Sequence, residues 1–217
     1  MNGLFITFEG PDGSGKSTQI QKLSDYLKER GISHVKTREP GGTIISDKIR
    51  ELLLSPDYSE MANETEVLLY AASRAQHVRE KIVPALKEGK VVLCDRFVDA
   101  SIAYQAYGLK LDVDKIIEIN RFATGGLAPH RSYLLDLSPE KARQRLLERN
   151  DLDRIELKQT DYHERVRSAF FTIYNENPQR ICMLNGEKGI EELFSKIMTD
   201  FDKLWSRYQM ISGGRSQ

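Results

Sequence analysis

The sequence contains only two cysteines among its 217 residues, Cys94 and Cys182, and each lies in a short apolar run. It has no CxxC pair and no Cys/His spacing typical of zinc sites, so neither a disulfide framework nor a structural zinc site is expected. Proline is limited to seven residues, and no tract of low complexity is present. These scarcities exclude the disulfide-rich and proline-rich classes, and both cysteines are expected in a hydrophobic core.

An excess of charge of either sign is also absent, because 32 lysines and arginines balance 32 aspartates and glutamates. Proteins that bind nucleic acid through its phosphates usually carry a basic excess, so no nucleic-acid partner is expected. The sequence has no apolar stretch of about 18 residues, as a membrane span requires, and no signal-like N-terminus. No membrane partner is therefore expected, and the cytoplasm is the expected location.

Short apolar segments alternate with segments of helical spacing along the whole chain. This alternation predicts an α/β fold in which a five-stranded parallel sheet is wrapped by helices on both faces. One domain is expected over residues 1–211, with a short lid at about 148–158 and a flexible tail at 212–217. The predicted strands are 4–8, 34–37, 91–94, 131–137 and 181–184, and the predicted helices are 16–30, 44–54, 64–87, 101–107, 112–123, 140–149, 161–175 and 190–208.

A phosphate-binding loop is predicted between the first strand and the first helix, where the sequence GPDGSGKS matches G-x-x-x-x-G-K-[ST]. The glycines let backbone N–H groups surround a polyphosphate at the positive end of a helix. Lys16 is expected to reach the β- and γ-phosphates, and the Ser17 hydroxyl to bind Mg²⁺. The predicted ATP-binding residues are Gly10, Pro11, Asp12, Gly13, Ser14, Gly15, Lys16, Ser17 and Thr18. The loop indicates a nucleotide binder and leaves the reaction open.

Two further features favour a kinase over other proteins with this loop. The Asn-Lys-x-Asp pattern of guanine-binding switches is missing, and the strand 91–94 leads into Asp95-Arg96-Phe97 rather than the acidic pair of motor ATPases. Asp95 is expected to hold Mg²⁺, and Arg96 to bind an anionic oxygen, as an acceptor that is itself a phosphate requires. A simple ion pair at the strand end is the alternative.

The polar stretch from Arg149 to Arg154 lies between two predicted helices. Arg149 and Arg154 are expected to provide positive charge over the transferring phosphoryl group, on a lid that excludes water. A solvated charged surface would account for the same pattern.

Several segments together closely resemble the thymidylate kinase family over almost the whole chain, within the nucleoside monophosphate kinases. They are 8–18 (FEGPDGSGKST), 38–43 (REPGGT), 70–77 (YAASRAQH), 95–97 (DRF), 103–105 (AYQ) and 152–156 (LDRIE). The resemblance implies reversible transfer of the ATP γ-phosphate to dTMP, giving dTDP, with Mg²⁺ and usually as a homodimer. ATP and dTMP are thus the expected small-molecule partners.

The resemblance also implies roles for individual residues. Asp12 would face the acceptor nucleotide, and Tyr70 would stack on thymine, where the family usually has phenylalanine; Tyr104 would crowd the 2′ side of the sugar. Tyr70 and Arg74 are four residues apart, which places them on one helix face. The implied dTMP-binding residues are Asp12, Arg38, Arg50, Tyr70, Arg74, Arg96, Ser101, Tyr104 and Gln105, the catalytic residues are Asp12, Lys16, Arg96, Arg149 and Arg154, and the metal-binding residues are Ser17 and Asp95.

The interior of the phosphate loop matches one subgroup of this family, typical of many bacteria. That subgroup has no arginine in the loop, as at Gly13 here, and places basic residues in the lid, as at Arg149 and Arg154. Two other hypotheses remain open. The chain could phosphorylate another nucleotide or a deoxynucleoside, or it could be a nucleotide-gated binding protein without acceptor-dependent turnover.

Overall fold

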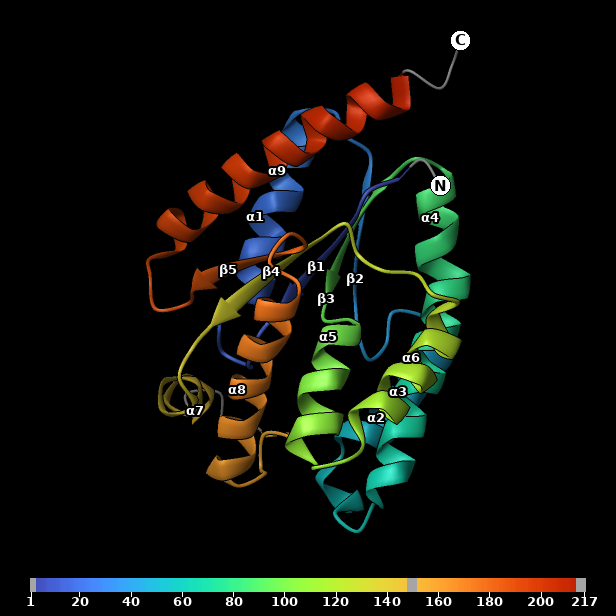
Figure 1. Cartoon of the computed structure of the whole chain (residues 1–217), viewed down its shortest axis with the longest axis vertical. Coiled ribbons are helices and arrows are strands. Elements are labelled where there is room, and N and C mark those ends of the chain that lie inside the picture. The colour runs from blue at the N-terminus through green and yellow to red at the C-terminus, as the bar shows by residue number, and fades with distance from the viewer. Residues whose placement is uncertain (1–2, 148–151, 214–217) are drawn as a thin grey trace.

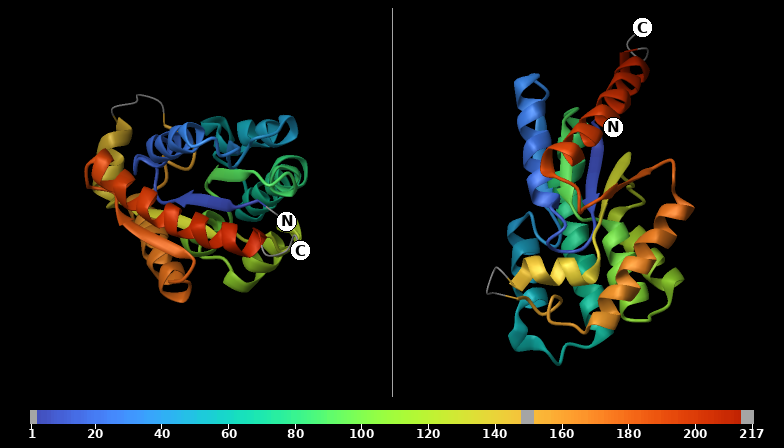
Figure 2. Two further views of the ribbon diagram at one scale, coloured as in Figure 1. Left: turned by 90° about the horizontal axis from the view of Figure 1, so that it is seen from above. Right: turned by 90° about the vertical axis from the view of Figure 1, so that its left-hand side faces the viewer.

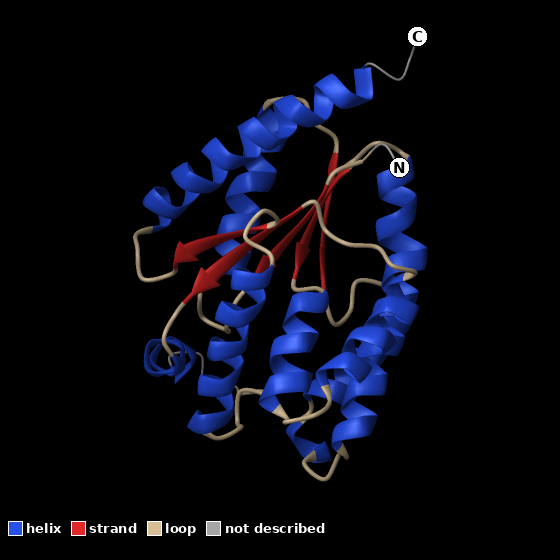
Figure 3. Ribbon diagram, viewed as in Figure 1, coloured by secondary structure: helices blue, strands red, loops and turns tan. Residues whose placement is uncertain are grey.

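A central parallel sheet organises the chain, of which the computed structural model describes residues 3–147 and 152–213. Its five strands pair in the order β2-β3-β1-β4-β5, and every neighbouring pair is parallel. The strand arrows therefore point toward one edge of the sheet (Figure 3). The strands are β1 Phe5–Glu9, β2 His34–Arg38, β3 Val91–Asp95, β4 Arg131–Asp136 and β5 Ile181–Asn185. The predicted α/β fold with a five-stranded parallel sheet is confirmed.

The side chains of β1 enter two different cores, because successive residues of a strand point to opposite faces of the sheet. Ile6 packs in a core with α1 (Lys16–Glu29) and α9 (Ile190–Gly213). Phe5 packs on the opposite face, with α4 (Val83–Lys87). Since β1 is buried on both faces, the loop that follows it starts from a rigid support.

Helices cover both faces of the sheet, as Figure 1 and Figure 2 show. In the right-hand view of Figure 2, α1 (blue) lies on one side of the strands and α8 (orange, Thr160–Glu176) on the other. α8 packs against Leu134 of β4 and against α5 (Val98–Ser101), which continues as a π-helix over Ile102–Gly108. The remaining helices are α2 Ile44–Leu54, a 3₁₀ turn at Pro56–Tyr58, α3 Asn63–His77, α6 Val113–Thr124 and α7 Pro139–Leu147.

The helix predicted over residues 64–87 is present but is not regular. Between α3 and α4 it contains a π-helical segment, Val78–Ile82, which ends two residues before Pro84. Proline lacks the N–H that an α-helix would use and its ring crowds the preceding turn, so a wider turn there accommodates it.

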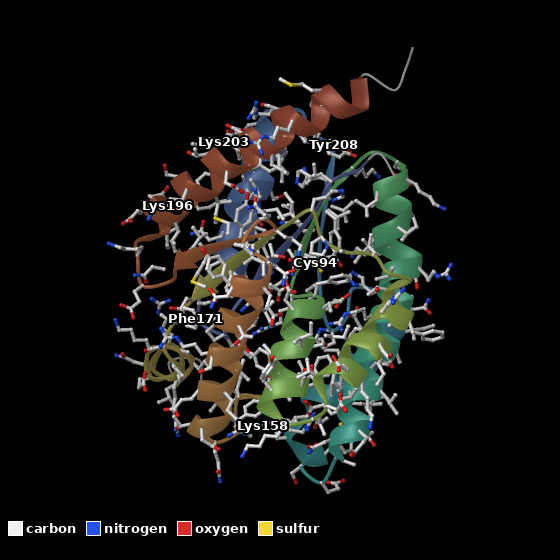
Figure 4. The ribbon with its side chains drawn as sticks, in the orientation of Figure 1. Cys94, Lys158, Phe171, Lys196, Lys203 and Tyr208 are labelled. Carbon is white, nitrogen blue, oxygen red and sulfur yellow. The ribbon has the colours of Figure 1, made fainter. Side chains whose placement is uncertain are left out.

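The two cysteines differ in burial. Cys94 is fully buried and lies in the middle of the molecule in Figure 4, whereas Cys182 is half-buried. Both are free thiols. The prediction of a core position therefore holds fully for Cys94 alone.

The segments around residues 148–151 and 214–217 lie outside the described residues, and with them Arg149 and most of the predicted tail. α9 continues to Gly213, five residues beyond its predicted end at Tyr208. Among the helices described, none is both long and apolar enough to span a membrane.

Candidate active site

The loop from Gly10 to Ser17 joins the carboxyl end of β1 to the first turn of α1. Gly10, Gly13 and Gly15 have φ values of 126°, 76° and 96°, a region that residues with a side chain rarely adopt. A Cβ at Gly10 would also lie 2.3 Å from the Leu135 carbonyl oxygen. The glycines are therefore needed for the backbone course of the loop.

A side chain at Gly13 would be crowded and strained. A Cβ there would lie 3.3 Å from both the Ala142 carbonyl oxygen and Cβ of Arg145, at a φ of 76°. Nη1 of Arg145 donates to the Gly13 carbonyl oxygen at 2.8 Å. An arginine at this loop position would be strained in its backbone and crowded against α7, in keeping with a loop that has no arginine of its own.

Lys16 is held within the loop. Its Nζ donates to the carbonyl oxygens of Gly10 at 3.1 Å and Pro11 at 2.8 Å, and the residue is 5% exposed. Burial, together with the nearby Arg96, lowers the pKa of Lys16 from its ordinary value. Its ammonium group therefore lies against the loop backbone, in the position expected of a phosphate-binding lysine.

Ser17 and Asp95 meet across the ends of α1 and β3. The Ser17 hydroxyl donates to Oδ2 of Asp95 at 3.1 Å. Both are hard oxygen donors of the kind that Mg²⁺ prefers, so the two side chains fit this ion. Within the described residues no group of three or more His, Cys, Asp or Glu side chains gathers to hold a metal. An ion here would therefore need further oxygens from phosphate or water.

Arg96 follows β3 and turns back onto the phosphate loop. Its φ of 69° is unusual for a residue with a side chain, and its N–H donates to the Phe8 carbonyl oxygen. Nη1 donates to the Gly10 carbonyl oxygen at 2.8 Å, and Nη2 lies 2.8 Å from Oδ2 of Asp12. The guanidinium also lies over the Tyr104 ring, 4.9 Å from its centroid. Arg96 is thus tied to the loop from a neighbouring strand.

A pocket opens beside this ion pair, at the carboxyl edge of the sheet. It contains eight of the nine residues expected to bind dTMP, all except Arg38. Burial raises the pKa of Tyr70 and of Tyr104 above their usual range, so both remain neutral phenols. The pocket is lined by Asp12, Glu39, Pro40, Arg50, Leu54, Tyr70, Arg74, Arg96, Ala100, Ser101, Tyr104, Gln105, Asp153 and Ile155. We call it the acceptor pocket.

Arg74 lines the acceptor pocket, donates four hydrogen bonds and is 2% exposed. Nε donates to Oε2 of Glu39 at 2.6 Å, Nη1 to Ser101 and Asn120, and Nη2 to the Phe97 carbonyl oxygen at 3.1 Å. Four of the five N–H donors of the guanidinium are thus used within the described residues, which leaves one on Nη2 for a ligand.

Glu39 is the counter-ion of Arg74. Its Oε1 also accepts from Nδ1 of His77 at 2.9 Å, and the Nε2 atom of His77 lies 2.6 Å from the Thr37 hydroxyl. Burial alone would raise the pKa of Glu39, but Arg74 and His77 hold it below its ordinary value. A charged Glu39 thus keeps the Arg74 guanidinium directed at the pocket.

Arg50 lines the pocket, and Arg38 lies near Arg50. Nη1 of Arg50 donates to the Pro40 carbonyl oxygen at 2.9 Å, and burial and the like charge of Arg38 lower the pKa of Arg50. Arg38 lies outside the described lining, with Nη2 3.4 Å from Oδ1 of Asp47 and more than half of its side chain exposed. Arg38 and Arg50 are close enough for their charges to repel each other.

Arg154 is held inside the molecule. We expected a cation on a lid over the transferring phosphoryl group, with a solvated surface as the alternative. Arg154 is 7% exposed, and its Nη2 lies 2.8 Å from Oε2 of Glu66, so the solvated alternative is wrong. Its Nε donates to the Leu53 carbonyl oxygen at 2.9 Å. Arg149, the other expected lid arginine, lies outside the described residues. A role for either residue at the transferring phosphoryl group stays a prediction.

Comparisons with known proteins bear directly on this arrangement. A sequence model of the thymidylate kinase family matches residues 8–197. The chain belongs to the thymidylate kinase family. It is 52% identical over 198 residues to a thymidylate kinase from an Exiguobacterium species, covering 91% of this chain and 93% of that protein. It is 42% identical over 197 residues to a thymidylate kinase from Clostridium novyi, covering 90% and 96% of the two chains.

A solved structure supports the same relationship. The crystal structure of thymidylate kinase from Ehrlichia chaffeensis is similar to this chain, with a TM-score of 0.77 and 31% sequence identity. The likeness covers 93% of this chain and all of the other. Family membership therefore extends from the sequence to the arrangement of the sheet and helices.

Glu9 is a buried acid of this thymidylate kinase family member that sequence reasoning missed. It directly precedes the phosphate loop, is 1% exposed, and neither carboxylate oxygen has a hydrogen-bond partner among the described residues. Burial, together with Asp99, raises the pKa of Glu9 to about 8. Arg96, Arg74 and Arg180 oppose this shift. Its position before Gly10 was visible in the sequence, but its burial was not.

Other functional neighbours also escaped prediction. Asn120 accepts from Arg74, and Asp153 lines the acceptor pocket. A larger cavity of about 430 Å³ lies between α7 and α8, and Asp12 and Tyr104 border both hollows. Asp12 therefore lies where the two hollows of this thymidylate kinase family member meet.

Proposed function

We propose that the chain transfers the γ-phosphoryl group of ATP to dTMP, giving ADP and dTDP. The observation that carries the proposal is the position of Arg96. Its guanidinium contacts the phosphate loop at Gly10 and Asp12 while it lines the acceptor pocket. A cation at this boundary can stabilise charge on a donor phosphate and on an acceptor phosphate together.

On the donor side, the loop amides and Lys16 would hold the phosphates of ATP. The Ser17 hydroxyl and the Asp95 carboxylate would hold Mg²⁺, which neutralises charge on the phosphate oxygens when it is bound. Lys16 already lies within the loop, and α1 begins at this residue. Its ammonium group would exchange its carbonyl partners for phosphate oxygens, which are stronger acceptors.

On the acceptor side, Arg96 and Arg50 would bind the phosphate of dTMP, with Arg38 near Arg50. Tyr70 and Arg74 line the pocket from one face of α3 and suit a flat base with a carbonyl acceptor. Tyr104 would lie against the sugar. Arg149 remains the predicted lid cation, whereas Arg154 is paired with the buried Glu66.

An acceptor panel tests the proposal against its two alternatives. Release of ADP from ATP would be measured with dTMP, CMP, AMP or no acceptor. The proposal expects the highest turnover with dTMP. Equal or faster turnover with CMP or AMP would indicate a kinase of another nucleotide. ATP binding without stimulation by any acceptor would favour a nucleotide-gated binding protein.

We also propose that the enzyme is a homodimer. Large apolar side chains are exposed on helices that pack against one another: Ile44 on α2 at 82%, Leu68 on α3 at 59% and Phe122 on α6 at 91%. Such a concentration of exposed apolar surface is typical of an interface. Sedimentation equilibrium should give twice the chain mass, and Phe122→Asp should shift it toward the monomer. A monomeric wild-type protein would contradict the proposal.

A further inference from the structure

Glu66 is a buried acid that lies behind the acceptor pocket. It is 1% exposed on α3, one helical turn before Tyr70. Its Oε1 accepts from Nε2 of Gln105 at 3.0 Å, and its Oε2 lies 2.8 Å from Nη2 of Arg154. Tyr70 and Gln105 line the pocket, whereas Glu66 and Arg154 are outside its described lining. Glu66 thus links α3 to the π-helical segment Ile102–Gly108, and both elements contribute residues to the pocket wall.

Arg154 makes three contacts, two with α2 and one with α3. Its backbone N–H donates to the Leu54 carbonyl oxygen at 3.0 Å, and its Nε donates to that of Leu53 at 2.9 Å. These carbonyls belong to the last turn of α2, where a helix has no backbone partners of its own. The ion pair with Glu66 is the third anchor. Arg154 therefore caps α2 and neutralises the buried acid.

The residues on either side of Arg154 face the pocket. Asp153 and Ile155 both line it, while Arg154 between them points away. The carboxylate of Asp153 also accepts from the backbone N–H of Ile155 at 2.8 Å and of Glu156 at 2.9 Å, which makes the segment rigid. The position of this wall is therefore determined by how Arg154 is held.

We infer that Glu66 and Arg154 form a positioning pair that shapes the acceptor pocket and so governs its affinity for dTMP. The inference rests on the proposed function for the identity of the acceptor. Gln105 and Tyr70 connect to the pair through Glu66, and Asp153 and Ile155 connect to it through Arg154. Neither member of the pair touches the substrate, and Arg154 is not the cation that meets the transferring phosphoryl group.

The chain offers a matched control in Lys158. Its Nζ also lies 3.6 Å from Oε2 of Glu66, but its side chain is 23% exposed and its ammonium is over the Tyr162 ring. Figure 4 places Lys158 in the lower part of the molecule, and it belongs to the segment that leads into α8. Lys158→Gln removes a cation from Glu66 without removing the anchor on α2.

The test compares steady-state constants of the wild type with those of Arg154→Met, Glu66→Gln, Lys158→Gln and the double variant Glu66→Gln/Arg154→Met. Each single change at the pair should raise the KM for dTMP about 10-fold or more, while kcat and the KM for ATP change by less than about 3-fold. Lys158→Gln should resemble the wild type. The double variant leaves no uncompensated buried charge, so its KM for dTMP should rise by less than the product of the two single effects.

Folding is monitored by circular dichroism and thermal melting. If a single variant fails to fold, the double variant and Arg154→Lys, which keeps the charge, are used in its place. Their KM for dTMP is compared with kcat and the KM for ATP in the same way. A fall in kcat of about 100-fold in Arg154→Met with an unchanged KM for dTMP would overturn the inference and support a phosphoryl contact. Unchanged constants in every variant, or fully multiplicative effects, would also overturn it. No turnover of dTMP by the wild type would overturn the proposed function as well, which separates the two failures.

Discussion

Nη2 of Arg96 lies 2.8 Å from Oδ2 of Asp12, so the cation at the end of β3 is paired with an acid inside the phosphate loop. β1 and β3 are adjacent parallel strands, and the register pairs Phe8 with Asp95. Their carboxyl ends therefore place the loop and the arginine side by side, as expected for a ligand site of an open parallel sheet. The φ of 69° at Arg96 turns its side chain toward the loop.

Replacing Arg96 should reduce catalysis more than binding of ATP. We expect Arg96→Ala to lower kcat by roughly 10²–10³-fold, because the variant loses a charge that acts on the transferring group. Steady-state kinetics with ATP and dTMP measure this effect. Arg121→Ala, on the exposed side of α6, is the matched control and should retain wild-type kcat. A wild-type kcat in Arg96→Ala would contradict the assignment.

The pair formed by Ser17 and Asp95 should determine the requirement for Mg²⁺. Ser17→Ala and Asp95→Asn should each raise the Mg²⁺ concentration for half-maximal activity by about tenfold or more, since each removes an oxygen donor. Titration of activity with Mg²⁺ at fixed ATP is the measurement. Asp25→Asn changes an exposed acid of α1 and should leave the titration unaltered. Superimposable curves for all variants would argue against a metal at this position.

The buried pair of Arg74 and Glu39 should contribute to stability as well as to the pocket. Arg74→Met leaves Glu39 buried with only His77 beside it, so we expect a loss of about 3–5 kcal/mol in the free energy of unfolding. Urea denaturation measures the loss. Lys48→Met breaks the exposed pair with Glu51 and should cost less than about 1 kcal/mol. Equal losses in the two variants would show that burial of the Arg74–Glu39 pair does not increase its effect on the free energy of unfolding.

Local sequence patterns predicted much of the fold. The apolar runs and the loop motif located the strands and Gly10–Ser17, because both depend on residues near in sequence. The family resemblance identified Tyr70, Arg74 and Gln105, which the structure places in one pocket. The conformations of these side chains depend on partners far away in the sequence, which a local sequence pattern cannot predict. Glu39, for instance, is 35 residues from Arg74.

The residues predicted for the lid show the limit of local reasoning most clearly. The polar run between two helices was expected to carry cations for the phosphoryl group or else to be solvated, yet Arg154 is buried against Glu66, 88 positions earlier in the chain. Charge pattern alone cannot separate a solvated arginine from one with a buried counter-ion, because the difference depends on tertiary packing. Glu66 itself was detectable only as an acid one helical turn from Tyr70.

Glu9 should make stability depend on pH. Its pKa of about 8 in the folded protein exceeds the ordinary carboxyl value of 4.5, so the folded state binds the proton more tightly than the unfolded state. Its contribution to stability is full below pH 4.5 and is lost as pH rises toward 8. Glu9→Gln removes this dependence and should therefore gain stability over the wild type progressively between these pH values, by up to about 5 kcal/mol.

Urea unfolding of both proteins at pH 5, 6.5 and 8 checks the prediction for Glu9. The difference in the free energy of unfolding between Glu9→Gln and wild type should increase across the series. Glu140→Gln, an exposed change on α7, provides a control in which no such increase is expected. A difference that stays constant from pH 5 to pH 8 would show that Glu9 is already ionised in the folded protein.

The fate of the γ-phosphate tests the central claim most directly. The wild-type protein would be incubated with γ-labelled ATP, Mg²⁺ and dTMP, and the labelled products separated. If the γ-phosphoryl group passes from ATP to dTMP beside Arg96 and Asp12, the label should appear in dTDP as ADP accumulates. Little label should appear in inorganic phosphate, because the acceptor outcompetes water. Label found only in inorganic phosphate, or in dTDP no faster than CMP is converted to CDP, would contradict the assignment of this chain as a dTMP kinase.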